Sequence, residues 1–261
     1  MSLPSARRFY ENQYQGETYG ADQDAGEQAN ELHRFIWDYD LKEREVLEIG
    51  FGRGSFQDLV KDWVGVELAV SASRFAHRPF VVASADHLPF KDACFDGIWS
   101  ISVLEHVPRV EQALREVARV LKPGGVALLA PAWHCRSWAA QGYAFRAWSE
   151  LDFKDRLVKV SIPLRECLWF RAACTIPVRI WRELVYTTRK RPFSLHYRKL
   201  KANYTTFWCA DSDACNSLDI SEMLLWFRAR GWDTPSHPTL LRRLLARHGS
   251  IWVRKPLTKT L

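Results

Sequence analysis

The sequence lacks any long apolar run, and this excludes a membrane-spanning helix. No stretch of about 18 uncharged apolar residues occurs in the chain of 261 residues. Arg7 and Arg8 near the N-terminus are not followed by an apolar segment, so we expect no signal peptide. These absences predict a cytoplasmic protein, with any membrane contact being peripheral and at the inner membrane surface.

The cysteines lack the spacing of a zinc site. They include no Cys-x-x-Cys pair, and no histidine stands at the spacing from them that zinc sites use. We therefore predict no bound metal, and thiols that are reduced as in the cytosol. The cysteines are Cys94, Cys135, Cys167, Cys174, Cys209 and Cys215.

The composition is that of a globular protein with a surplus of basic residues. Hydrophobic residues make up 47% and charged residues 26%, which predicts a folded chain over most of its length. The net charge is +7. This surplus is either an ordinary solvated face or a surface for an acidic partner: a phosphorylated substrate, an anionic membrane or nucleic acid.

The first half of the chain alternates short apolar segments with helical patterns. Apolar segments rich in β-branched residues predict strands over 46–49, 63–67, 80–83, 95–101 and 126–130, and periodic segments predict helices over 25–39, 55–61 and 109–121. This alternation predicts a parallel sheet with both faces covered. Such a sheet binds its ligands at the carboxyl ends of the strands.

The alternation of strand and helix patterns ends after Pro131. Residues 132–217 are rich in Trp, Arg and Cys, and the stretch 165–201 holds ten Lys or Arg against two acids. Regular signals return at Asp219, which we expect to cap a helix over 223–230 that ends at Gly231. A closing strand is expected over 250–253, whereas residues 1–25 read as a loosely structured arm.

A glycine-rich turn follows the first predicted strand. Gly50, Gly52 and Gly54 have no Cβ, so the backbone can approach a ligand closely and aim free N–H groups at it. A dinucleotide fingerprint needs its third glycine where Ser55 stands, and the Gly-Lys-Ser/Thr of a P-loop is absent. The turn favours a nucleoside-like ligand without a pyrophosphate, and a tight turn without ligand is the alternative.

Acidic residues end the next two strands. Glu67, 17 residues after Gly50, could accept hydrogen bonds from both hydroxyls of a ribose. Asp86 could accept one from an amino group such as the exocyclic amine of adenine, with His87 and Leu88 against the ring. The alternatives are that Glu67 caps the following helix and that Asp86 only begins a turn.

Six segments in order carry a resemblance to a known family. They are VLEIGFGRG (46–54), GVE (65–67), ADHLPF (85–90), FDGI (95–98), LEHV (104–107) and RVLKPGG (119–125). The series resembles class I S-adenosylmethionine (SAM)-dependent methyltransferases of the small-molecule type, which include the ubiquinone/menaquinone biosynthesis methyltransferases. The resemblance covers residues 45–131.

The resemblance implies SAM as the cofactor and assigns roles to particular residues. In the family the glycine turn lies against the methionine part of SAM, the acid after the second strand binds ribose, and the Asp after the third meets adenine. The cofactor-binding residues implied here are Glu48, Gly50, Gly52, Gly54, Glu67, Leu68, Asp86, His87, Leu88, Ser102 and Val103. Glu48 stands where Asp is commoner, and Arg53 adds a charge where a small residue or Thr is usual.

The predicted fold class is α/β: a Rossmann-like, doubly wound, mostly parallel sheet of seven strands, with a helical insertion rich in aromatic residues and Arg after the fifth. The expected segments are an N-terminal arm and helix (1–44), the SAM-binding core (45–131), an inserted lid or acceptor lobe (132–217) and a C-terminal completion of the core (218–261).

Methyl transfer from SAM is an in-line displacement, so the protein mainly supplies approach geometry. An oxygen acceptor usually also needs a base to take its proton. His134, at the junction of core and lid, is the favoured candidate, with His106 and Tyr143 behind it. The alternatives are that His106 only packs and that His134 is an ordinary loop histidine.

The expected acceptor is an anionic small molecule, a saccharide or a lipid-linked saccharide, methylated on oxygen. Aromatic residues interleaved with Arg in 132–217 suit a sugar phosphate or a lipid headgroup, and residues 203–216 with Asp219 resemble bacterial methyltransferases of surface-glycan synthesis. Nucleic acid is less favoured, because the Asp/Asn-Pro-Pro-aromatic and Pro-Cys motifs and an RNA-binding module are all absent. The alternatives are an RNA methyltransferase and a SAM-binding regulatory protein without turnover. Peripheral membrane contact is expected through 189–191 and residues near Trp169, Phe170 and Trp181.

Overall fold

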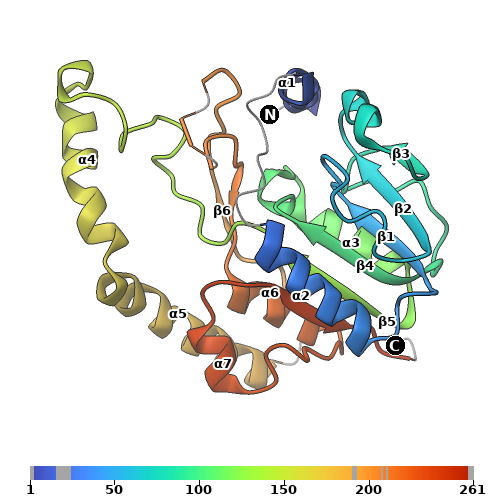
Figure 1. Cartoon of the computed structure of the whole chain (residues 1–261). Coiled ribbons are helices and arrows are strands. Elements are labelled where there is room, and N and C mark those ends of the chain that lie inside the picture. Colours follow the sequence, from blue (N-terminus) through green and yellow to red (C-terminus); the bar gives the residue numbers. More distant parts are fainter. Residues whose placement is uncertain (1–2, 16–24, 190–192, 207, 210, 258–261) are drawn as a thin grey trace.

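The computed structural model describes residues 3–15, 25–189, 193–206, 208–209 and 211–257 (Figure 1). Its centre is a six-stranded sheet of order β3-β2-β1-β4-β5-β8. The pairs among β1 to β5 are parallel, and β8 runs antiparallel to β5. The predicted fold class is confirmed with one strand fewer than expected, because residues 229–250 form turns and a short helix instead of a further strand.

The strands of the main sheet are β1 (Glu45–Ile49), β2 (Asp62–Glu67), β3 (Phe80–Val82), β4 (Phe95–Ile101), β5 (Leu121–Ala130) and β8 (Ile251–Arg254). A small second sheet pairs β6 (Arg198–Lys199) with β7 (Asn216–Ser217). The helices are α1 (Leu3–Gln15), α2 (Ala25–Asp38), α3 (Val110–Val120), α4 (Phe153–Glu166), α5 (Leu168–Arg189), α6 (Ile220–Arg228) and α7 (Leu240–Leu245). Short 3-10 turns are η1 (Val70–Phe75), η2 (Leu104–His106) and η3 (Trp148–Glu150).

Helices cover both faces of the sheet, as continuous apolar strands require. Successive residues of β1 point to opposite faces. Val46 joins the apolar cluster that contains Leu32 and Phe35 of α2. Leu47 joins the cluster that contains Leu114 of α3 and the apolar side of α6. The carboxyl ends of β1, β2 and β4 therefore meet at one edge of a sheet held on both sides.

The segment 55–61 does not form the predicted helix; it consists of turns. The buried side chain of Gln57 accounts for this local geometry. Its amide nitrogen donates to the carbonyl oxygens of Gly54 and Phe75, and its oxygen accepts from the backbone N–H groups of His77 and Arg78. A side chain that satisfies backbone groups across a loop in this way competes with helical hydrogen bonding.

The expectation of a loose N-terminal arm is wrong for residues 3–15, which form α1. Ala6, Phe9 and Tyr10 are buried, and their spacing places them on one face of the helix. The Glu11 carboxylate accepts hydrogen bonds from the backbone N–H groups of Val70 and Ser71. These contacts dock α1 across the edge of the sheet. Residues 16–24 lie outside the described residues.

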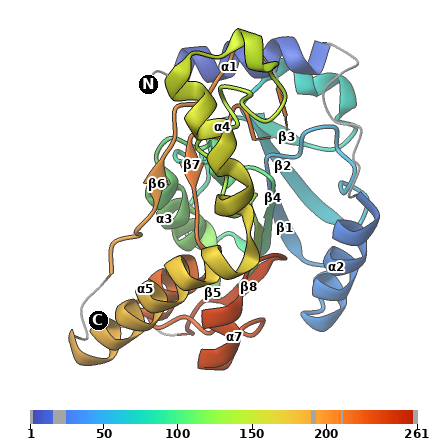
Figure 2. The ribbon, with the colours of Figure 1, turned by 90° about the vertical axis from the view of Figure 1, so that its left-hand side faces the viewer.

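The chain after β5 builds the helical insertion. Helices α4 and α5 run along one side of the molecule away from the sheet, and they face the viewer in Figure 2. Helix α6 begins as predicted, because the Asp219 carboxylate accepts from the backbone N–H groups of Ser221 and Glu222. Gly231, at φ +77°, follows its end. The division into core, lid and completion remains a proposal.

Candidate cofactor site

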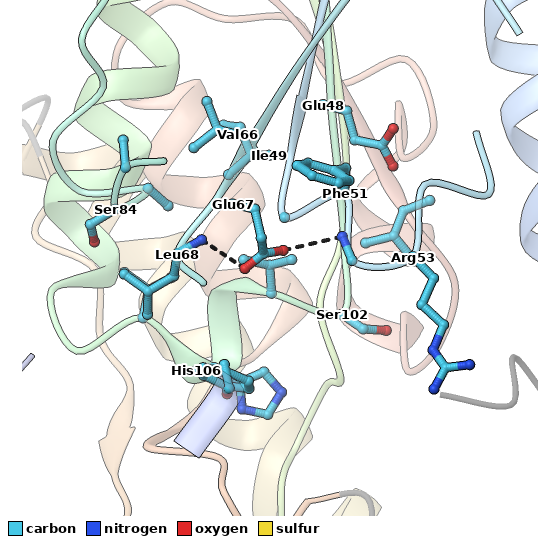
Figure 3. Close-up of a pocket in the computed structure, with 18 of the residues that line it drawn as sticks. Glu48, Ile49, Phe51, Arg53, Val66, Glu67, Leu68, Ser84, Ser102 and His106 are labelled. Carbon is cyan, nitrogen blue, oxygen red and sulfur yellow. Dashed lines mark hydrogen bonds between the residues drawn. The ribbon is translucent and has the colours of Figure 1, made fainter. Parts of the chain in front are cut away.

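A cavity lies at the carboxyl ends of β1, β2 and β4, where the sequence predicts the cofactor (Figure 3). Most of the residues expected to bind the cofactor line it, together with one of the two histidines that are candidate bases. These residues are Glu48, Gly50, Gly52, Glu67, Leu68, Ser102, Val103 and His106. The remaining predicted residues, Gly54, Asp86, His87, Leu88 and His134, are not part of its lining.

The glycine turn brings backbone to the cavity in a conformation that other residues rarely adopt. Gly50 has φ +76°, and its N–H donates to the Val66 carbonyl at 2.7 Å. A Cβ at this position would lie 2.2 Å from Cγ2 of Val103. Gly50 is therefore required both by its dihedral angle and by the close approach of the segment after β4.

Glu67 joins the ends of β1 and β2. Its Oε2 accepts a hydrogen bond from the Gly52 N–H at 3.1 Å, and its Oε1 accepts one from the Leu68 N–H at 2.7 Å (Figure 3). The bond from Leu68 is local, whereas the bond from Gly52 crosses to the glycine turn. The carboxylate is thus held at the cavity wall, at the position from which a ribose would be bound.

Glu48 places a second carboxyl group in the cavity wall, and this one is fully buried. It accepts a hydrogen bond from Nε1 of Trp63 at 2.8 Å. Burial raises the pKa of Glu48 to about 8, and the nearby Glu67 carboxylate acts in the same direction. Among the described residues no Lys, Arg or His forms an ion pair with Glu48.

Three residues in the turn after β3, Asp86, His87 and Leu88, do not line the cavity. The Asp86 carboxylate accepts from the Ser84 hydroxyl at 2.7 Å and pairs with Nε of Arg109 at 2.8 Å. His87 is exposed, and Leu88 belongs to the apolar core. Adenine contacts by these residues therefore remain a prediction, and the neighbouring Ser84 and Ala85 line the cavity in their place.

His106 lies in the cavity wall opposite the glycine turn, within a group of buried acids. Its Nδ1 is 3.3 Å from Oδ2 of Asp213, and its Nε2 is 3.6 Å from Oε1 of Glu105. Burial alone would lower the pKa of His106, but the carboxylates of Asp213 and Glu105 outweigh it and raise that pKa above its ordinary value. The Tyr10 hydroxyl donates to Oδ2 of Asp213 at 2.8 Å.

Sequence reasoning missed the part of this site that α1 and the β7 region supply. Ala6, Tyr10 and Gln28 line the cavity, and Asp213 is fully buried behind His106. A usable signal was present in α1, since Ala6, Phe9 and Tyr10 repeat at helical spacing. For Asp213 no local signal exists, because it lies more than a hundred residues from His106 in sequence.

The structure places His134 in a different cavity. That cavity lies between the 134–138 loop, the α4–α5 junction and the small sheet, and it shares no lining residue with the first. Nε2 of His134 is 3.4 Å from Nη2 of Arg179. Burial, together with Arg179, lowers the pKa of His134. Tyr143 lies in neither lining; its hydroxyl donates to Asp155, which raises the pKa of Tyr143 to about 12.

The second cavity is rich in arginine. Arg136, Arg165, Arg171 and Arg198 line it, and Glu166 is the carboxylate among its lining residues. Glu166 pairs with Arg136. Burial and the neighbouring Arg247 and Arg136 lower the pKa of Arg171, so this guanidinium lies in a locally positive environment.

The fold and the first cavity define an α/β domain that binds a nucleoside-like ligand at the carboxyl ends of parallel strands. Residues 47–129 match a family model described as a methyltransferase domain. The chain is 54% identical over 46 residues to the ubiquinone/menaquinone biosynthesis C-methyltransferase UbiE of Bartonella tribocorum, which covers 18% of each chain. It is 36% identical over 101 residues to uncharacterized protein MJ1252 of Methanocaldococcus jannaschii, covering 36% of this chain and 40% of the relative.

Among solved structures, the YcgJ protein of Bacillus subtilis is 32% identical, with a TM-score of 0.36 over 40% of this chain and 51% of that chain. The chain thus spans less than half the length of the curated relatives described above. Over the matched segment it carries a class I SAM-dependent methyltransferase domain, and SAM is the cofactor of this family.

The residues of the cavity fit SAM. The observation that carries this fit is Glu48, a cavity-lining residue whose carboxyl group accepts a hydrogen bond from Trp63 and has no ion-pair partner among the described residues. The α-ammonium group of SAM would supply that partner. Glu67, fixed by Gly52 and Leu68, would supply the acceptor for ribose hydroxyls.

Proposed function

We propose that the chain transfers the methyl group of SAM to an oxygen atom of a small anionic acceptor, a saccharide or lipid-linked saccharide. The observation that carries methyl transfer is the presence of His106 in the wall of the same cavity as Glu48 and Glu67. Binding residues and a candidate base thus share one cavity, which residues of α1 and of the segment after β4 also line.

SAM, when bound, supplies a methyl group already activated by its sulfonium. The protein then has to hold the acceptor oxygen in line and take its proton. In this proposal neutral His106 accepts this proton. The imidazolium that forms is stabilised by Asp213 and Glu105, which is why they raise the pKa of His106. Tyr10 holds Asp213 in position through its hydroxyl group.

The anionic character of the acceptor is supported by the arginine-lined cavity. Its guanidinium groups outnumber the carboxylates in its lining, and a neutral ligand would leave them without counter-charge. The two cavities lie on either side of β7: Ser217 lines the second, and the side chain of Asn216 donates to the carbonyl of Val107, which lines the first. An acceptor with its acidic group in the second cavity would extend from His134 towards His106.

The test uses the purified chain with SAM and fractionated bacterial extracts, and measures formation of S-adenosylhomocysteine. We expect turnover that survives nuclease treatment and falls after phosphatase treatment of the extract. Loss of turnover after nuclease would instead identify a nucleic acid acceptor. SAM binding without turnover on any fraction would contradict the proposed transfer and favour a regulatory SAM-binding protein.

His106→Gln and His134→Gln separate the two candidate bases. We expect His106→Gln to keep SAM affinity and lose about 10²–10⁴-fold in turnover, the usual contribution of a general base. His134→Gln should keep turnover at saturating acceptor and raise the acceptor KM. The opposite pattern would return the role of base to His134. The cytoplasmic location expected from the sequence stays a prediction.

A further inference from the structure

Over residues 168–188, helix α5 turns its charged side chains towards the protein and large apolar side chains outward. Arg179 pairs with Asp219, Arg182 with Glu222, and Glu183 with Arg228 and Arg243. Arg171, the remaining charged residue between 168 and 188, is also partly buried. Every fully exposed side chain in this stretch is therefore uncharged. A helix on an ordinary solvated surface has the reverse arrangement.

The exposed side of α5 is made of large apolar side chains. Trp169 is 80% exposed and Trp181 65%. Leu168, Phe170, Val178, Ile180 and Leu184 are also exposed. Large apolar side chains that are exposed together on one helix are typical of an interaction site.

Helix α4 continues this surface. Phe153, Leu157, Val160 and Leu164 are exposed, and their spacing of four, three and four residues places them on one face. Helix α7, which packs beside α5, adds the exposed side chains of Leu240, Leu241 and Leu245. Figure 2 shows α4, α5 and α7 on the same side of the molecule, the side that faces the viewer. We call these three helices and their exposed apolar residues the apolar helix face.

The charges that border the apolar helix face are mainly positive. Lys154, Arg156 and Arg165 are exposed on α4, and Arg242 is exposed on α7. The nearby exposed acids are already engaged. Glu166 pairs with Arg136, Glu150 with Arg146, and Asp152 caps α4 by accepting from the N–H of Asp155.

We propose that the apolar helix face docks on the surface of an anionic lipid bilayer. Tryptophan and leucine side chains bordered by Lys and Arg match the bilayer interface, where aromatic rings sit at headgroup depth and cations meet lipid phosphates. The attachment is peripheral, since no helix in the described part of the chain is long and apolar enough to span a membrane. The basic residues at 190 and 191 lie outside the described residues.

Charge complementarity favours the bilayer over a second copy of the chain. Two such faces in a symmetric dimer would bring their bordering cations together, which opposes association at low salt. The same cations attract the phosphates of an anionic bilayer, and salt weakens this attraction by screening. The proposal does not depend on methyl transfer, so the two can fail separately.

Flotation of the full-length protein with vesicles tests the proposal. The vesicles contain phosphatidylcholine alone or phosphatidylcholine with phosphatidylglycerol. We expect recovery with the anionic vesicles to exceed recovery with the neutral ones at least about fivefold, and to fall in high salt. Trp169→Glu/Trp181→Glu should reduce binding to anionic vesicles at least about tenfold, because two interfacial anchors become anions.

Trp37→Glu is the matched control. Trp37 on α2 is 86% exposed, so this change adds a carboxylate at an exposed tryptophan away from the apolar helix face. Its flotation should equal that of the parent. Equal recovery with neutral and anionic vesicles, equal loss in the Trp37 variant, or full binding by the double variant would each overturn the proposal. So would a concentration-dependent dimer in sedimentation that only the double variant abolishes. Near-ultraviolet circular dichroism verifies that each variant is folded.

Discussion

The pKa of Glu48 leads to a prediction that couples stability, pH and cofactor binding. Burial raises this pKa from its ordinary 4.5 to about 8 in the folded chain. Between these values the folded state holds a proton that the unfolded state releases, so stability falls as pH rises. The protonated Glu48 contributes its full stabilisation below about pH 4.5, and this contribution is lost as the pH rises through about 8. Its upper limit is on the order of 5 kcal/mol.

Glu48→Gln removes this titration. The amide oxygen of Gln can still accept the hydrogen bond from Trp63, so the change is close to isosteric. From pH 6 to pH 8 the parent should lose about 2 kcal/mol more unfolding free energy than the variant. Urea unfolding followed by tryptophan fluorescence at several pH values measures the difference. Parallel pH profiles for parent and variant would refute the reasoning.

Cofactor binding should reverse the protonation of Glu48. If the ammonium group of SAM pairs with this carboxyl group, the carboxyl must ionise, and close to one proton is released at pH 7. Calorimetric titration in buffers of different ionisation enthalpy counts that proton. Glu48→Gln should release none and bind SAM about 1–3 kcal/mol more weakly. A parent that binds SAM without proton release would contradict the assignment of Glu48.

Further predictions concern the rest of the site. Glu67→Ala should weaken SAM binding by about 1–3 kcal/mol by calorimetry, whereas Asp86→Ala, outside the cavity lining, should weaken it less; the reverse order would restore the adenine role of Asp86. Gly50→Ala should abolish SAM binding, because its Cβ would lie 2.2 Å from Val103 in a positive-φ conformation, and normal binding would show that the turn can rearrange. Turnover should rise with pH through the raised pKa of His106, since only the neutral imidazole accepts a proton; a flat profile would exclude it as the base. Tyr10→Phe should shift that rising limb without changing SAM affinity, and an unshifted limb would show that Tyr10 does not act through Asp213.

The sequence was sufficient where local pattern determines structure. The strands around 46–49 and 95–101, the α3 helix and the cap at Asp219 all follow from periodicity and capping chemistry. The glycine turn and Glu67 were predictable for the same reason, because each directly follows a buried strand. Their meeting at one edge follows from parallel topology alone.

Local pattern failed where a distant contact decides the conformation. Residues 55–61 have helical periodicity, but the Gln57 side chain bonds to Phe75, His77 and Arg78 and holds turns instead. His134 follows β5 closely in sequence, so we expected it near the cofactor as a base. It instead lines the arginine-rich cavity, together with Ser217 of β7. Asp86 lies in the turn after β3, which ends at Val82, and its carboxylate pairs with Arg109 of a later segment.

The same long-range contacts assemble the proposed catalytic group. Tyr10 comes from α1, His106 from η2 after β4, and Asp213 from the segment before β7, more than a hundred residues from His106. Burying three ionisable groups in contact costs folding free energy unless each group offsets the desolvation of its neighbour. Here the carboxylate of Asp213 faces His106, and Tyr10 donates a hydrogen bond to one of its two oxygens. An inert core would achieve the same packing with apolar side chains at lower cost. Under the proposed function, this group beside the cofactor cavity takes up the proton of the acceptor oxygen.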